Sequence, residues 1–287
     1  MKTTKIWIGI GTFIVAGNGA WGAPTPGLAQ SLATVLVLSR GGLPSDGILP
    51  GMMHLAQQHG GEAVQGGEQG VADLPPDLAF AVRIALIRGH LSVGDELVKQ
   101  GQWAAALPHF LRPGEEIYAG LSEQLDDYRV PPFDRALKAL ADVVKAKKGG
   151  ADYTRTRAAV NSALALADAS LRDKQSADWA GFIIEAAVEL LKIAGGEYGA
   201  AIVDRRFAKP VEYQDARGFV WHAEQMIGAV ASDLERKDAA ALKQVHMSLA
   251  EIKKAFPKAM PPKAPVKDQA TVIEEIARIE LAAGRLM

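Results

Sequence analysis

Imidazole and carboxylate side chains gather in one short part of the chain, between residues 90 and 118. This group consists of His90, Glu96, His109, Glu115, Glu116 and Tyr118. Imidazole nitrogens and carboxylate oxygens are ligands of zinc and of non-haem iron, so His90, His109 and Glu116 form a candidate metal site. Neither histidine has a partner three or four residues away, the spacing that places two ligands on one helix face. The alternative is that the histidines pack and hydrogen-bond locally, while the glutamates favour a helix start after Pro113.

A second candidate metal cluster combines thioether and imidazole side chains in a glycine-rich segment. It contains Met52, Met53, His54 and His59. Soft thioether ligands together with imidazole suit copper. A partly buried helix turn explains Met52 and Met53 equally well, because apolar side chains at that spacing pack against a core.

Aromatic side chains are concentrated between residues 179 and 221. They are Trp179, Phe182, Tyr198, Phe207, Tyr213, Phe219 and Trp221. Aromatic residues at helical spacing usually pack in a core. The functional interpretation is an apolar cavity in which a few polar groups orient a ligand. The residues that we take as candidate ligand contacts are Trp103, Phe110, Tyr118, Trp179, Phe182, Tyr198, Trp221 and His222.

Motifs of the common catalytic centres are absent from the sequence. There is no G-x-S-x-G, no S-x-x-K, no H-E-x-x-H, and no glycine-rich phosphate loop between a strand and a helix. We therefore predict that the protein is not an enzyme and needs no cofactor.

The composition excludes further classes of protein. The 287 residues are 48% hydrophobic and 23% charged, with a formal net charge of -1 and no cysteine. A chain without net positive charge has no basic field for a nucleic acid backbone, so nucleic acid is not an expected partner. The lack of cysteine excludes disulfide scaffolds, iron-sulfur clusters, thiol nucleophiles and lipid attachment at a cysteine.

Residues 1–22 have the pattern of a signal peptide. Lys2 and Lys5 precede an apolar run over residues 6–16, and the small residues Ala20 and Gly22 suit a cleavage site. The alternative is an uncleaved anchor helix, although the run is about half of the roughly 20 residues that span a bilayer. No later stretch is long and apolar enough to span a membrane. We expect a mature periplasmic protein.

The rest of the chain divides into three parts. Residues 23–76 are rich in glycine, with one short helix over 28–38, and are interpreted as a linker or lid. Residues 77–129 contain a helical hairpin and a following helix, and residues 130–287 a helical bundle. The predicted helices span 77–99, 103–111, 115–127, 133–147, 153–174, 178–194, 213–237, 239–256 and 268–286. For the helix over 178–194, the alternative is that it resumes after the two glycines and continues through residue 202. Because strands with strict alternation are absent, we predict an all-α fold.

The first hairpin resembles a tetratricopeptide repeat. The spacing of Gly94, Leu97 and Gly101, followed by Ala106 and Phe110, is similar to that of the repeat, and no second copy follows it. Small residues at Gly94 and Ala106 would let the two helices cross closely, with Leu97 and Phe110 filling the space beside the crossing. The resemblance implies a single helix-turn-helix.

Pro108 lies inside the second helix of this hairpin and should kink it, because proline lacks an amide and pushes on the carbonyl four residues earlier.

The whole chain, exported and helical with one repeat-like hairpin, also resembles helical periplasmic components of bacterial envelope lipid transport, including sterol transport. That resemblance implies a non-enzymatic carrier or adaptor for an apolar lipid such as a sterol, with envelope transport proteins as partners. The alternative from the residues is a periplasmic helical protein that binds iron or copper.

Overall fold

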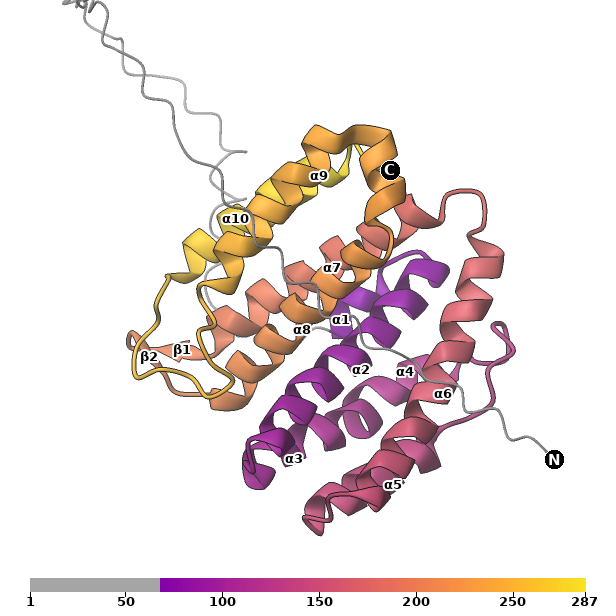
Figure 1. Cartoon of the computed structure of the whole chain (residues 1–287), viewed down its shortest axis with the longest axis vertical. Helices are drawn as coiled ribbons and strands as arrows, with labels where there is room; N and C mark the ends of the chain where they lie inside the picture. The colour runs from indigo at the N-terminus through magenta and orange to yellow at the C-terminus, as the bar shows by residue number, and fades with distance from the viewer. Residues whose placement is uncertain (1–67) are drawn as a thin grey trace, which may run out of the picture. The chain divides into compact units, whose positions relative to one another are not determined.

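The computed structural model describes residues 68–287. The predicted signal peptide, the helix over 28–38 and the Met52 to His59 cluster lie outside the described residues. Figure 1 shows that the described part is built from helices, with one short hairpin of strands. The prediction of an all-α helical bundle is therefore confirmed.

The helices and strands follow one another along the chain in this order. They are α1 (Glu68–Ala72), α2 (Pro76–Lys99), α3 (Trp103–Arg112), the π-helix η1 (Pro113–Ile117), α4 (Tyr118–Ser122), α5 (Asp134–Lys145), α6 (Ala151–Lys174), α7 (Trp179–Ala200), β1 (Ile202–Val203), β2 (Arg206–Phe207), α8 (Pro210–Ala229), α9 (Ala231–Lys253) and α10 (Gln269–Ala283). Strands β1 and β2 form an antiparallel hairpin in which Ile202 pairs with Phe207.

Helix α2 is the central helix of this arrangement. It packs against α3, α6, α7 and α8, and most of its residues from Leu78 to Leu97 are buried. A helix that is apolar on nearly every side requires neighbours all round, which these four helices supply. By contrast α6 is buried along one stripe, formed by Val160, Leu164, Ala167 and Leu171. Its other faces meet solvent.

Helices α7, α8, α9 and α10 pack together as the C-terminal bundle. In Figure 1 α9 and α10 lie side by side, at the opposite end of the described part from α5 and α6. Two of these helices begin at an aspartate whose side chain accepts a hydrogen bond from an early amide of the helix: Asp178 from Gly181 and Asp268 from Thr271. Such caps satisfy an amide that has no partner inside the helix.

Two buried tyrosines hold the proline-rich segment between α9 and α10. The hydroxyl of Tyr213 donates to the carbonyl of Lys258 at 2.9 Å, and that of Tyr198 donates to the carbonyl of Lys267 at 2.6 Å. Burial raises the pKa of each phenol to about 12, so both remain donors at neutral pH. Both ends of the segment are therefore bonded to the α7–α8 pair.

Two predicted helix boundaries are wrong, and the sequence leaves a third, at the end of α7, open between two alternatives. Helix α7 continues through Gly195 to Ala200, in line with the longer alternative, and Gly195 packs against Ile276 of α10. The helix predicted over 213–237 breaks at Val230, where α8 ends and α9 begins. The helix predicted over 115–127 is a π-helical turn followed by α4, which ends at Ser122.

The π-helical turn follows from the proline at its start. The amide of Tyr118 donates to the carbonyl of Pro113, five residues earlier. Pro113 has no amide of its own, so the hydrogen bonds of α3 cannot continue unchanged through this position. The predicted stop after Lys237 is present, as the non-helical backbone of Asp238 (φ -156°, ψ 96°) within α9.

The close crossing predicted for the first hairpin is present between α2 and α3. A methyl group at Gly94 would lie 2.6 Å from the Phe110 ring, and Leu97, Ala106 and Phe110 are buried. Gly101 has a positive φ of 73° in the connecting turn, a conformation that favours glycine. The relation to tetratricopeptide repeats stays a prediction, since one such hairpin occurs in many helical folds.

Candidate metal centre

Three buried side chains converge from three different helices. His90 on α2, His109 on α3 and Asp215 on α8 each offer a ligand atom, and these atoms all lie within 4.8 Å of one another. Nδ1 of His90 and Nδ1 of His109 both lie 2.7 Å from the same oxygen, Oδ1 of Asp215. We call these three residues the His-His-Asp cluster.

The neighbours of His109 determine what its nitrogen atoms can do. Nε2 of His109 lies 2.9 Å from Oε1 of Gln214, whose amide nitrogen donates to the sulfur of Met260. Since Oε1 can only accept, Nε2 carries the proton. Nδ1, facing the carboxylate of Asp215, then either carries a second proton or binds another cation.

Asp215 is held as a carboxylate despite complete burial. Burial alone would raise its pKa, but His90 and His109 keep the pKa below its usual range. Its second oxygen, Oδ2, accepts a hydrogen bond from Nη1 of Arg112 at 2.5 Å. The carboxylate thus faces positive or potentially positive groups on both oxygens.

A close crossing of α2 and α8 positions the cluster. Gly89 on α2 packs against Gly218 on α8, with no room for a Cβ on the latter. The next residues, His90 and Phe219, meet edge to face at a centroid distance of 4.9 Å. His90 is therefore fixed between Phe219 and Asp215.

Further carboxylates surround Arg112. Its guanidinium lies 3.5 Å from both Glu116 and Glu212, in addition to its bond with Asp215. Glu197 on α7 belongs to the same group, because burial, followed by the charge of Asp215, raises its pKa to about 7. We call Glu116, Glu197 and Glu212 the acidic entrance. There, the positive charge of Arg112 faces the negative charges of several carboxylates.

The donor set fits a divalent transition metal. Two imidazoles and one carboxylate are the ligands of many non-haem iron sites, and they also suit zinc. In such sites an outer hydrogen bond orients each ligating histidine. Gln214 supplies one to His109. The Arg112 guanidinium is a competitor, because it bonds to the carboxylate oxygen that a cation would also attract.

The structure brings together two of the three predicted metal residues. His90 and His109 lie in the cluster, whereas Glu116 is exposed and pairs with Arg112. Asp215 takes the carboxylate position. It lies 125 residues after His90, so no local spacing connects the two. Both histidines bond to this distant aspartate, so the prediction of local hydrogen bonds within the hairpin is wrong.

The predicted ligand contacts are spread over several parts of the described chain. Trp103 and Phe110 both meet Tyr153, and Tyr118 meets Phe133. Tyr198 packs with Phe207, Tyr213 and Phe256 in an aromatic cluster, and Trp221 lies beneath the cations of Arg217 and Lys253. Phe182 stacks on Trp179. Of the predicted contacts, Trp179 and His222 line the pocket described below.

No helix between residues 68 and 287 combines the length and apolar character needed to cross a membrane.

Residues 173–287 match the family model of the iron permease-associated 4-helix bundle domain. No curated protein and no solved structure matches the chain. The matched segment includes α7 to α10, and therefore Asp215, Glu197 and Glu212. His90 and His109 precede it, so the hairpin of α2 and α3 supplies both imidazoles.

Proposed function

We propose that this chain is a periplasmic, non-enzymatic helical protein that binds iron and serves an iron permease. The observation that carries the proposal is the convergence of His90, His109 and Asp215 on a common point. The likeness of residues 173–287 to an iron permease-associated domain supports iron as the cargo.

The protonation of His109 favours a cation at the cluster. Gln214 fixes one ring proton on Nε2, which leaves Nδ1 directed at a buried carboxylate. A divalent metal ion that takes the place of a proton at Nδ1 bonds both side chains and adds one positive charge, beside the carboxylates of the acidic entrance. Binding is therefore a proton-for-metal exchange, as is usual for imidazole ligands.

The carboxylates near the cluster range from buried to exposed. Side-chain exposure increases from 0% at Asp215 to 22% at Glu212 and 54% at Glu116, and the Arg112 guanidinium contacts all three. An incoming cation first meets the exposed carboxylate and then competes with Arg112 for the buried one. Carboxylates of this kind raise the local concentration of cations.

The ligand types argue against Cu(I) at this place. The three converging atoms are imidazole nitrogens and a carboxylate oxygen, whereas Cu(I) prefers thiolate and thioether sulfur. The proposal of a copper site at Met52 to His59 concerns residues outside the described part and is independent of this one.

Metal analysis of the full chain tests the proposal. The protein is incubated anaerobically with Fe²⁺, desalted and assayed for iron. We expect stoichiometric iron in the wild type and its loss in Asp215→Asn and in His109→Gln. The matched control is His246→Gln, because His246 is an exposed histidine on α9.

Circular dichroism separates a lost ligand from a lost fold. If Asp215→Asn does not fold, His90→Gln replaces it, because His90 retains slight exposure at the edge of the cluster. A wild-type protein that retains no iron overturns the proposal. Equal iron in folded wild type and folded His109→Gln overturns it as well.

A further inference from the structure

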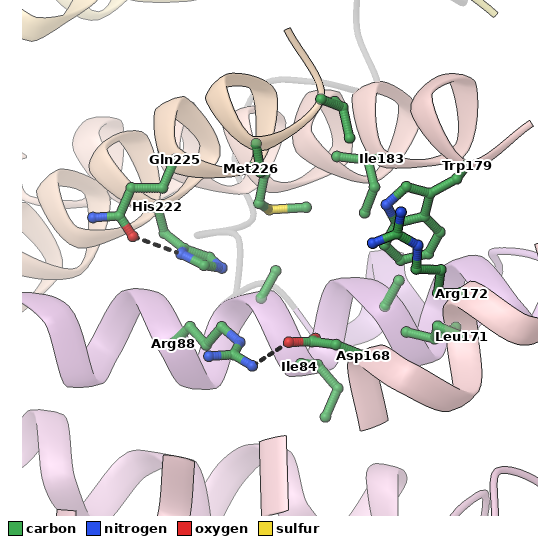
Figure 2. Close-up of a pocket in the computed structure, with 14 residues that line it drawn as sticks. Ile84, Arg88, Asp168, Leu171, Arg172, Trp179, Ile183, His222, Gln225 and Met226 are labelled. Atoms are coloured by element: carbon green, nitrogen blue, oxygen red, sulfur yellow. Dashed lines mark hydrogen bonds and ion pairs between the residues drawn. The ribbon is translucent and has the colours of Figure 1, made fainter. Parts of the chain in front are cut away.

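A pocket that shares no residue with the His-His-Asp cluster lies between α2, α6, α7 and α8 (Figure 2). Its volume is about 340 Å³, which lies in the range of roughly 300–1,000 Å³ common for small-molecule sites. Its apolar lining includes Ile84, Leu171, Trp179, Ile183, Met226 and Val230. Four helices of the chain therefore line a mainly apolar pocket that is open to solvent on one side.

His222 directs an imidazole into this pocket from α8, as Figure 2 shows. The residue is only 9% exposed, and its Nδ1 faces Oε1 of Gln225 at 3.4 Å. Burial, and then the charge of Arg88, lowers the pKa of His222 to about 4, so the ring is neutral at pH 7. With Nδ1 donating to Gln225, Nε2 is an acceptor that has no partner within residues 68–287.

An ion pair lies opposite His222. Nη2 of Arg88 on α2 bonds to Asp168 on α6, and Figure 2 shows the pair facing the imidazole across the pocket. The pair uses one of the five guanidinium N–H groups, so Arg88 retains donors for a ligand. The pair has no net charge, and His222 is neutral. The interior of the pocket therefore favours a neutral polar group.

We propose that this pocket binds a small phenol, with its hydroxyl between His222 and Arg88. A hydroxyl satisfies both groups at once, because its proton is donated to Nε2 of His222 and its oxygen accepts from Arg88. The ring occupies the apolar space beside Trp179 and Met226, which offer an aromatic surface and a polarisable sulfur. A purely apolar molecule of the same shape leaves Nε2 of His222 without a partner, which disfavours it.

The proposal does not depend on metal binding. Its residues lie on α2, α6, α7 and α8, and none belongs to the cluster or to the acidic entrance. A failed iron assay leaves it unaffected, and its own failure leaves the iron proposal unaffected.

Fluorine NMR with two nearly isosteric probes tests it. The probes are 4-fluorophenol and 4-fluorotoluene, which differ by a hydroxyl in place of a methyl group. We expect saturable binding of the phenol to the wild-type protein, roughly tenfold tighter than binding of the toluene, which corresponds to about one good hydrogen bond. Equal affinity of the two probes, or no saturable binding of the phenol, overturns the proposal.

Variants of His222 identify the acceptor. His222→Phe keeps a ring but removes the acceptor, so the preference for the phenol should fall severalfold, with the donation from Arg88 remaining. His222→Gln retains an acceptor oxygen and should recover part of the preference, which a merely structural role of His222 would not produce. His246→Phe, outside the pocket, should behave as the wild type. An unchanged preference in folded His222→Phe overturns the assignment.

Discussion

Gly218 on α8 faces the backbone carbonyl of Gly89 on α2, at a separation that leaves no space for a Cβ on Gly218. The residues beside this contact serve different sites. His90 and Asp215 form part of the cluster, while Arg88 and His222 line the pocket of Figure 2. The spacing between the two helices therefore determines the geometry of both sites.

Gly218→Ala should separate α2 from α8, because the opposing atom belongs to the backbone and cannot rotate away. We expect a loss of stability of about 1–3 kcal/mol, measured by urea unfolding, together with weaker metal binding. Gly196→Ala is the control, since nothing lies within 4 Å of its added Cβ, near the C-terminal end of α7. That variant should gain up to about 1 kcal/mol from reduced backbone entropy. Equal stability of the two variants would contradict the close crossing.

Glu197→Gln should stabilise the metal-free protein at alkaline pH. The pKa of Glu197 is raised to about 7 in the folded state, so folding favours the protonated form and loses stability as pH rises from about 4.5 through 7. Glutamine removes that loss. The free energy of unfolding of Glu197→Gln, relative to that of the wild type, should therefore be about 1–3 kcal/mol greater at pH 8 than at pH 4.5. Thermal unfolding at the two pH values measures it. Glu235→Gln, on an exposed position of α9, should show no such difference.

Asp215→Asn should destabilise the metal-free protein by about 3 kcal/mol at pH 7, because it leaves Arg112 without its buried carboxylate. The folded-state pKa of Asp215 is depressed, so its ionised form stabilises the protein above the unfolded value of about 4 and loses this effect as pH falls below it. The difference between wild type and variant should therefore shrink on acidification. A difference that is independent of pH down to about 2 would contradict the ionised state of Asp215.

Arg112→Gln should tighten metal binding while weakening the metal-free fold. The Arg112 guanidinium occupies Oδ2 of Asp215 and competes with a cation for the same carboxylate. Its removal should lower the Kd for Co²⁺, used as an air-stable probe, by roughly tenfold, since charged hydrogen bonds contribute about 1.5–3 kcal/mol. The control is Arg155→Gln, because Arg155 pairs with Asp152 on the surface of α6. Unchanged or weaker Co²⁺ binding would show that Arg112 does not compete.

Local sequence patterns predicted the helices well where the pattern was strong. Helix α2 was predicted over 77–99 and spans Pro76–Lys99, because its apolar periodicity and the preceding prolines agree. The pattern was ambiguous where a distant residue contributes. Gly195 left open whether the helix ends or continues to about residue 202, and in the structure it continues, with Ile276 of α10 packed against Gly195.

The candidate metal site could be predicted only in part, for a similar reason. His90 and His109 are close in the sequence and their chemistry is evident, so both were candidates. Asp215 lies on another helix, and only the packing of α8 against α2 brings it to them. Acidic residues are common in amphipathic helices, and nothing in the local sequence distinguishes a buried one.

The two tyrosine hydroxyls that hold Lys258 and Lys267 have a consequence for how the chain opens. A terminal helix such as α10 ordinarily frays first, because few contacts restrain it. Here, the bond of Tyr198 restrains the chain just before α10, and the bond of Tyr213 restrains it just after Phe256, beside the buried aromatic side chains. Opening the whole region from Lys258 to α10 therefore requires breaking both bonds, which couples its opening to the α7–α8 pair.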